Sequence, residues 1–221
     1  MTLTNLNYIY FDEKINIDSW TILSIENTKV FAKFIENIKY YDYQQDLKLF
    51  DKNYNAVKSS KILVINDILN FELNNVGVLK TIYSDIDRQI KDNLELRNKI
   101  HQLKNEISNL LIDEIIEYPL DLSFDEITNI ELIKSLGVKI NESSTSLYEK
   151  LIDILNLYKF LPNKELLILT NVSCYFSKDE MEELRRHSSL LGGKVLLVEP
   201  RKVYGFPQYM LDDDFYMSSI L

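Results

Sequence analysis

The sequence predicts an α/β protein whose head is interrupted by a long helical segment. Two observations support this class. Apolar runs typical of buried strands occur near both ends of the chain, at residues 20–25, 62–65, 166–170 and 194–198. Between these groups the apolar side chains recur at helical spacing. We therefore expect a discontinuous α/β head of residues 1–74 and 163–221, and a helical leg of residues 75–162.

The composition limits the protein class. The chain has 221 residues, 46% of them hydrophobic, with only five Gly and four Pro. This is ample for a buried core and leaves little room for long flexible linkers. The net charge of −9 argues against a nucleic-acid partner for the surface as a whole, because phosphate binding depends on Lys and Arg. A local basic surface, or acidic sites filled by a hard cation, is compatible with this charge.

The sequence also predicts where the protein resides. The single cysteine, Cys174, cannot form an internal disulfide, which fits a reducing compartment. The N-terminus lacks the features of a signal peptide, and no apolar run approaches the ~20 residues that a membrane span needs. We expect a soluble, cytoplasmic protein with no membrane partner.

The first part of the head is predicted from strand and turn patterns. In chain order it contains a hairpin of residues 8–17, a strand at 21–25, a helix at 28–38, and strands at 47–50 and 62–65. The run at 62–65 is continuously apolar, which is typical of a central strand buried on both faces.

The junction between the strand at 21–25 and the following helix lacks glycine. A P-loop needs glycines there, because backbone N–H groups must approach the phosphates closely, and it needs a Lys and a Ser/Thr at the helix start. This chain has Glu26, Asn27 and Thr28 instead, and Asn27 or Thr28 is predicted as an ordinary N-cap. The pattern indicates the scaffold of a P-loop protein without its phosphate-binding loop.

The leg is predicted as two long helices followed by two shorter ones. Apolar residues share one face from Leu79 to Ile90, Asp92-Asn93 interrupts the pattern, and a second run continues to Tyr118. The second run would extend roughly 39 Å, so its apolar stripe needs a partner helix from this chain or from another copy.

Three capping boxes mark the starts of the later helices. They are Ser123 to Glu126, Ser146 to Glu149 and Ser177 to Glu180. Gly137 is predicted to end the first helix, Pro162 the second, and Gly192-Gly193 the third. The third helix lies between the strands at 166–170 and 194–198, which we expect to be parallel.

Few residues point to catalysis. The carboxyl ends of the predicted strands carry Glu26, Asp67, Asn171 and Glu199, at the edge where open α/β sheets bind ligands. Asp67 is either a remnant of a nucleotide site or the cap of a turn, and the second is favoured because the phosphate-binding loop and its Lys are missing. The two histidines and Cys174 form no recognisable triad or zinc motif, so we do not expect an enzyme.

The charged residues allow two kinds of site. The densest acidic segment, residues 113–131, contains enough carboxylates for calcium, although helix capping and a solvated surface are the favoured explanation from the residues alone. Lysines are scattered, and no basic block typical of nucleic-acid binding occurs.

The order of short segments resembles a known family. These segments are residues 21–27 (TILSIEN), 46–51 (DLKLFD), 64–69 (VINDIL), 79–85 (LKTIYSD), 137–140 (GVKI), 149–155 (EKLIDIL) and the closing Phe215-Tyr216. Over nearly its full length the chain is similar to the small accessory proteins of type II-A CRISPR adaptation, the Csn-type spacer-acquisition family.

The resemblance implies a fold, a function and partners. It implies a P-loop-NTPase-like head without NTPase activity, a helical leg, and a homotetrameric ring that holds double-stranded DNA ends. The partners it implies are the CRISPR adaptation integrase and the effector nuclease. It also implies Ca²⁺ bound by Glu117, Asp121, Asp125, Glu126 and Glu131. DNA contacts would come from Lys139, Lys150 and Lys159.

Two alternatives stay open from the residues alone. The chain could be an interaction scaffold of P-loop ancestry that docks proteins through its leg and never binds DNA. It could also be a nucleotide hydrolase that depends on Asp67.

Overall fold

The computed structural model describes residues 4–43, 45–142 and 144–220, and it divides into two compact units. The first unit comprises Met1–Phe71 and Ser143–Leu221, and the second comprises Glu72–Glu142. The discontinuous α/β head was therefore expected in outline, but its second segment begins about twenty residues earlier than predicted. The helix before residue 160 consequently belongs to the α/β unit and not to the helical one.

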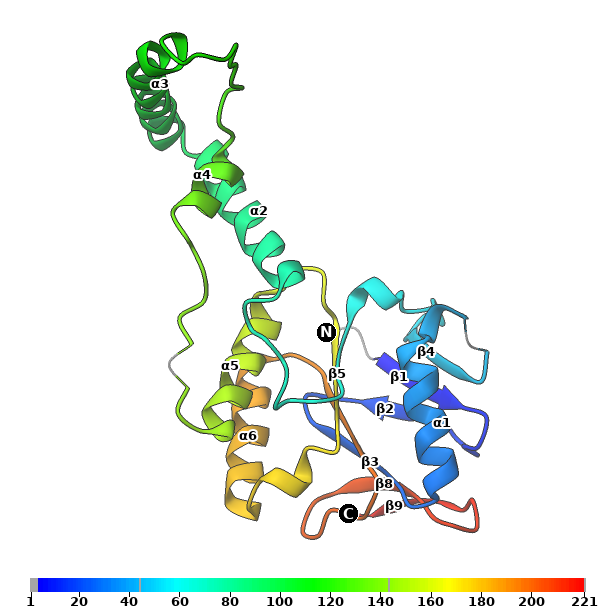
Figure 1. The fold of residues 1–221 in the computed structure, drawn as a ribbon. Helices are drawn as coiled ribbons and strands as arrows, with labels where there is room; N and C mark the ends of the chain where they lie inside the picture. The colour runs from blue at the N-terminus through cyan, green and yellow to red at the C-terminus, as the bar shows by residue number, and fades with distance from the viewer. Residues whose placement is uncertain (1–3, 44, 143, 221) are drawn as a thin grey trace. The chain divides into compact units, whose positions relative to one another are not determined.

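A six-stranded sheet forms the centre of the first unit (Figure 1). Its strand order is β5 (Ile62–Ile65), β6 (Leu166–Thr170), β7 (Val195–Glu199), β3 (Thr21–Ile25), β8 (Gln208–Leu211) and β9 (Met217–Ile220). The first five strands are parallel, and β9 pairs antiparallel to β8. Every residue of β3, β6 and β7 is buried, as their continuous apolar sequences predicted.

Strand β5 is at the edge of this sheet, so its predicted central position was wrong. Its end residues Ile62 and Ile65 are buried, while Leu63 and Val64 are only half-buried. A run of four apolar residues is also compatible with an edge strand, which is covered on its faces but lacks a hydrogen-bonding neighbour on one side. The sequence pattern reports burial of side chains and not the presence of a second hydrogen-bonding neighbour.

A second, antiparallel sheet contains β2 (Ile15–Ile17), β1 (Thr4–Tyr8) and β4 (Leu47–Asp51) in that order. A hairpin is present, with Thr4 opposite Ile17, but its first strand is Thr4–Tyr8 and ends where the predicted hairpin was expected to begin. Helix α1 (Thr28–Lys39) buries Val30, Phe34 and Ile38 in a core that also contains residues of both sheets. The short 3₁₀ turns η1 (Tyr41–Tyr43) and η2 (Ser59–Lys61) flank β4 and β5.

Helices α5 (Leu147–Phe160) and α6 (Lys178–Leu191) lie side by side, with the sheet between them and α1 (Figure 1). Helix α5 buries Leu151, Ile154 and Leu155, and this burial explains why it belongs to the α/β unit. The predicted Ser177–Glu180 capping box opens α6, and Gly192 ends it with φ of 69°. The box at Ser146 is incomplete, because the Glu149 carboxylate accepts hydrogen bonds from Thr145. The 3₁₀ turn η3 (Ser173–Tyr175) precedes α6.

The second unit contains α2 (Val76–Asp92), α3 (Leu94–Ile116) and α4 (Asn129–Ser135). The two long helices and the break between them were predicted correctly. Their small core consists of Tyr83, Ile90 and Ile133, with partly buried apolar neighbours. In the described part of the chain, no helix combines the length and the apolar character needed to cross a membrane.

The predicted capping box at Ser123–Glu126 was wrong. Helix α4 begins at Asn129, and the box that opens it is Thr128 with Glu131. Both sequences fit the Ser/Thr-x-x-Glu pattern. The second box is used because it directs Ile130 and Ile133 into the small core of the helical unit.

Candidate nucleic-acid interface

At the junction between β3 and α1, backbone N–H groups are already hydrogen-bonded within the chain. Asn27 is the N-cap, and its Oδ1 accepts hydrogen bonds from the backbone N–H groups of Lys29 (3.1 Å) and Val30 (3.2 Å). The backbone N–H of Glu26 donates to the carbonyl of Leu211 in β8 (2.9 Å). These N–H groups occupy the place where a helix start would otherwise hold an anion. The predicted N-cap is confirmed at Asn27.

Asp67, after β5, caps a turn. Its Oδ1 accepts from the backbone N–H groups of Leu69 (2.9 Å) and Asn70 (3.1 Å), and its Oδ2 accepts from Nδ2 of Asn70 (2.6 Å). These bonds, those from Asn70 above all, hold the pKa of Asp67 below its ordinary value. Of the two interpretations of Asp67, the turn cap is the one that the hydrogen bonds bear out.

Glu199, at the end of β7, is 1% exposed and holds the loop after β6. Its Oε1 accepts from the backbone N–H groups of Val172 (2.9 Å) and Ser173 (3.0 Å), and its Oε2 accepts from the Ser173 hydroxyl (2.6 Å). Burial raises the pKa of Glu199, and the three bonds offset part of that effect. Asn171, in the same loop, adopts a left-handed conformation with φ of 54°. Sequence analysis placed Glu199 at the ligand edge of the sheet but did not find this structural role.

The acidic residues suggested as calcium ligands are spread over the helical unit. Glu117, Asp121 and Asp125 are exposed. Glu126 Oε1 lies 3.5 Å from His101 Nδ1 and 3.9 Å from Lys104 Nζ.

Glu131 is already used as a helix cap. Its Oε2 accepts from the N–H (2.8 Å) and the hydroxyl (2.7 Å) of Thr128, and these bonds lower the pKa of Glu131. Within residues 4–43, 45–142 and 144–220, no three Asp, Glu, His or Cys side chains gather in a way that could hold a metal ion. The five predicted ligands are therefore not brought together within one chain.

The three lysines suggested as DNA contacts also occupy different places. Lys139 is exposed in the helical unit, after α4. Lys150 and Lys159 are both on α5, nine positions apart, which corresponds to opposite sides of the helix and roughly 13 Å along its axis. The Lys150 amino group donates to the carbonyl of Leu69 (2.7 Å), whereas Lys159 is exposed at the end of the helix. The two α5 lysines therefore do not form one DNA-binding surface.

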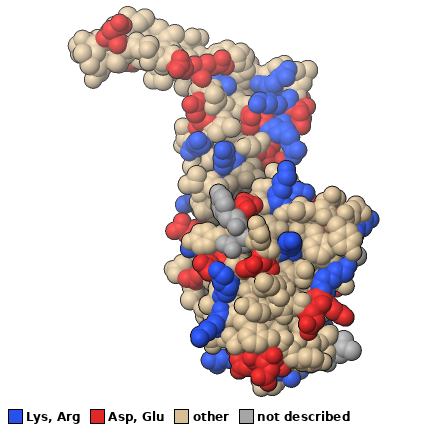
Figure 2. Space-filling model, turned by 90° about the vertical axis from the view of Figure 1, so that its right-hand side faces the viewer, with Lys and Arg blue, Asp and Glu red and all other residues tan. Residues whose placement is uncertain are grey.

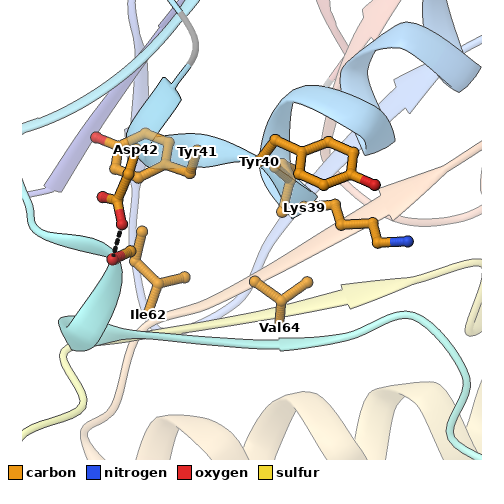
Figure 3. Close-up of a pocket in the computed structure, with 8 residues that line it drawn as sticks. Lys39, Tyr40, Tyr41, Asp42, Ile62 and Val64 are labelled. Carbon is orange, nitrogen blue, oxygen red and sulfur yellow. Dashed lines mark hydrogen bonds between the residues drawn. The ribbon is translucent and has the colours of Figure 1, made fainter.

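A pocket of 280 Å³ lies between the end of α1 and strand β5 (Figure 3). Ile62 and Val64 point into it from the sheet, and Tyr40 and Lys39 border it. Asp42, also in its lining, accepts a hydrogen bond from the Ser59 hydroxyl.

Helix α3 carries an exposed apolar stripe at helical spacing. It consists of Leu103, Ile107, Leu110 and Leu111, whose exposed fractions are 45%, 52%, 77% and 51%. Contiguous apolar surface of this kind marks interaction sites in soluble proteins. The expectation that the stripe needs a partner is consistent with this exposure.

These features define a class: a mixed α/β protein with an inserted helical unit. At the carboxyl ends of its parallel strands, the polar side chains are hydrogen-bonded to the protein's own loops. Comparison with known proteins identifies the family. The family model described as CRISPR-associated protein (Cas_Csn2) matches residues 40–215. The chain is 35% identical to the CRISPR-associated protein Csn2 of Streptococcus agalactiae over 97% of both chains. It is 36% identical to the Csn2 protein of Enterococcus faecalis over 96% of this chain and 97% of that protein. The protein belongs to the Csn2 family of CRISPR-associated proteins.

A solved structure agrees with the fold. The crystal structure of Stu0660 of Streptococcus thermophilus matches with a TM-score of 0.65, covering 99% of this chain and 76% of that one. The sequence identity is only 13%, so this likeness concerns the fold alone.

Proposed function

We propose that this protein binds double-stranded DNA ends, without catalysis and without sequence preference, and thereby supports CRISPR spacer acquisition. In this proposal it acts as a homotetrameric ring and works with the adaptation integrase and the effector nuclease. The observation that carries the proposal is membership of the Csn2 family over nearly the whole chain. A ring around a duplex contacts the phosphate backbone and not the base edges, so its binding would be independent of sequence and sensitive to salt.

The head supports a non-catalytic role. We infer a P-loop-NTPase-like ancestry from its parallel strands and from the strand-to-helix turn between β3 and α1. Asn27 uses its side chain where a bound phosphate would receive N–H groups. Asp67 and Glu199 hold loops of the protein itself. The positions that a nucleotide hydrolase would use for phosphate and metal therefore serve the fold.

Self-association is supported by the exposed stripe on α3. Full burial of a Leu or Ile side chain contributes about 1.5–3 kcal/mol, so each of these half-exposed residues would add roughly 1 kcal/mol on association. Four such residues in each of two copies would contribute about 8 kcal/mol, which lies within the roughly 4–15 kcal/mol that association costs, so an assembly needs further contacts as well. A second copy of the chain presents the same stripe, so isologous pairing is geometrically available.

The net negative charge of the protein limits how it could bind DNA. The net charge of −9 opposes DNA binding unless cations offset part of it or basic residues gather locally. Acidic and basic side chains alternate over the face in Figure 2 and do not separate into two regions. We propose Ca²⁺ as the offsetting cation, bound through Glu117, Asp121 and Asp125. Carboxylate oxygens suit calcium, which takes six to eight oxygen ligands, so further ligands must come from backbone, water or another copy.

The test compares linear with covalently closed DNA in a gel shift at rising salt, with and without calcium. End binding predicts that only linear DNA is retained and that retention falls steeply with salt. Light scattering after size-exclusion chromatography measures the oligomer under the same conditions. Equal retention of closed circles, or no retention at low salt, contradicts the DNA-end function.

One observation favours a second candidate. The exposed stripe on α3 fits equally a protein-interaction scaffold that docks through its helical unit and does not bind DNA. A monomer in excess calcium, together with no DNA retention, would support the scaffold and contradict the ring.

A further inference from the structure

The outer face of the small antiparallel sheet carries a pocket of 610 Å³. Two residues of β4, Lys48 and Phe50, point away from the core, because the leucines that alternate with them are buried in it. In the neighbouring strand β1, Asn7 lies opposite Lys48. Tyr54 and Lys58, which follow β4 in the chain, also line the pocket. One pocket therefore combines an amide, aromatic rings and lysines.

Tyr54 presents an exposed aromatic surface at a backbone position that does not favour tyrosine. Its φ is 62°, in the left-handed region where Gly and Asn are the usual residues. The side chain is nevertheless 75% exposed, so burial of the ring does not compensate for this conformation. The Tyr54 ring stacks on that of Phe50, with centroids 5.4 Å apart and an angle of 11° between the planes. The turn thus holds a flat aromatic surface at the rim of the pocket.

The lining of this pocket carries more positive than negative charge, although the protein as a whole is acidic. Among the described residues of the lining, Asp42 is the only carboxylate, against the two lysines Lys48 and Lys58. The Asp42 carboxylate accepts a hydrogen bond from the Ser59 hydroxyl. Neither lysine forms an ion pair within the described residues. Both ammonium groups are therefore available to an anionic ligand.

Lys14 and Asp51 border the pocket. The Lys14 amino group lies 5.6 Å from the centre of the Tyr54 ring. The Asp51 carboxylate is held within its own turn, where it accepts from the backbone N–H groups of Asn53 (2.8 Å) and Asn55 (2.9 Å). The side chain of lysine is flexible, so Lys14 can leave the ring when a planar ligand takes its place and can pair with an anionic group of that ligand.

We propose that this pocket binds a nucleotide whose base is unpaired. The base stacks on the Tyr54 ring, the Asn7 amide forms hydrogen bonds with the edge of the base, and Lys48 and Lys58 bind the phosphate. Proteins that bind single strands use this combination, in which aromatic side chains stack on bases and basic groups contact the backbone. The volume suits a nucleotide, because sites for small molecules typically measure about 300–1,000 Å³.

The proposal goes beyond the DNA-end function and does not depend on it. A ring around a duplex contacts phosphates, whereas this pocket offers a stacking surface to a base that has left its pair or has none. Free nucleotides and unpaired nucleotides at the end of a nucleic-acid strand share this chemistry. An acidic peptide could pair with the lysines, but its carboxylates would leave the aromatic surface and the amide unused.

The first arm of the experiment titrates the full-length protein with adenosine 5′-monophosphate, adenosine and inorganic phosphate at constant ionic strength. Calorimetry measures affinity, and saturation-transfer NMR reports whether the base protons contact the protein. We expect the nucleotide to bind more tightly than adenosine or phosphate, because it uses both parts of the pocket. The base protons should receive saturation, and intermolecular NOEs should connect them to the rings of Phe50 and Tyr54.

Matched variants separate the two parts of the pocket. Tyr54→Leu should weaken nucleotide binding about tenfold, whereas Tyr54→Phe, which keeps the ring, should leave it unchanged. Lys48→Gln should weaken binding of the nucleotide several-fold and leave that of adenosine unchanged, because only the nucleotide has a phosphate. Lys99→Gln, at an exposed position of α3, is the control and should bind like the wild type.

The second arm compares a blunt-ended DNA duplex with the same duplex carrying a short thymidine overhang. An overhang that tightens binding to the wild type but not to Tyr54→Leu assigns the pocket to unpaired nucleotides at strand ends. Nucleotide binding without any effect of the overhang assigns the pocket to free nucleotides. If the wild type binds no DNA but still binds the nucleotide, the proposed DNA-end function fails and the pocket stands.

Three results would overturn the proposal. The first is a nucleotide that binds no more tightly than inorganic phosphate, and the second is nucleotide binding that Tyr54→Leu leaves unchanged. The third is a hexaglutamate peptide that binds as tightly as the nucleotide, which would show that the lysines act alone in docking acidic peptides. If Tyr54→Leu does not fold, the NOEs of the wild type decide, and their absence contradicts stacking.

Discussion

Replacing Glu199 by alanine should destabilise the α/β unit by about 3 kcal/mol. The carboxylate accepts two backbone N–H groups and the Ser173 hydroxyl, and Val172 is fully buried. Hydrogen bonds to a charged group contribute about 1.5–3 kcal/mol each, and removing a buried charge recovers several kcal/mol of desolvation. The difference leaves a net loss of about 3 kcal/mol.

Urea denaturation followed by Trp20 fluorescence measures this loss. Trp20 is the only tryptophan of the chain and directly precedes β3, so its signal reports on the α/β unit. Glu13→Ala, at an exposed position of the hairpin, is the matched control and should change the free energy of unfolding by less than about 0.5 kcal/mol. A Glu199→Ala variant as stable as this control would refute the role of Glu199 in holding the loop.

The raised pKa of Glu199 also predicts how the stability difference between the wild type and a Glu199→Gln variant depends on pH. Burial raises the pKa of Glu199 above its ordinary value of 4.5. A carboxyl group with a raised folded-state pKa stabilises the fold fully below its unfolded pKa, and this contribution is lost as the pH rises through the folded pKa. The stability of the wild type relative to Glu199→Gln should therefore fall as the pH rises from about 4. A difference that increases with pH would contradict the raised pKa.

Three further predictions concern helix caps and the apolar stripe. Asn27→Ala should lower the free energy of unfolding by about 1 kcal/mol and Asn27→Ser by much less, because serine also caps; equal losses in urea denaturation would contradict the cap. Thr128→Ala should reduce helicity in far-UV circular dichroism and stability by about 1 kcal/mol, while Ser123→Ala should change neither, which separates the observed capping box from the predicted one. Ile107→Ser with Leu110→Ser should lower the mass measured by light scattering without loss of helicity, and an unchanged oligomer would exclude this stripe from the interface.

Most strands and helices could be predicted because their signals are local, but β8 and β9 near the end of the chain were not predicted. The apolar run of β6 and the capping box of α6 depend on neighbouring residues alone. The edge position of β5 could not be predicted, because it depends on which strands are adjacent in space. The membership of α5 in the α/β unit depends likewise on its packing against α6, which lies further along the chain.

The candidate sites were less predictable for the same reason. Glu199 binds backbone N–H groups more than twenty positions earlier, and no residue pattern encodes such a bond. Competing Ser/Thr-x-x-Glu motifs before α4 could be separated only by their packing.

The divided first unit has a consequence for how the chain folds during synthesis. Lys61 and Glu165 pair across 104 positions, and the buried bond from Ser24 to Gln208 spans 184. Contacts this distant in sequence slow folding, since large loops must close before they form. The ribosome must therefore produce the chain as far as β8 before β3 acquires both of its neighbours. Until then its apolar residues stay uncovered, and the nascent chain is a natural client for chaperones.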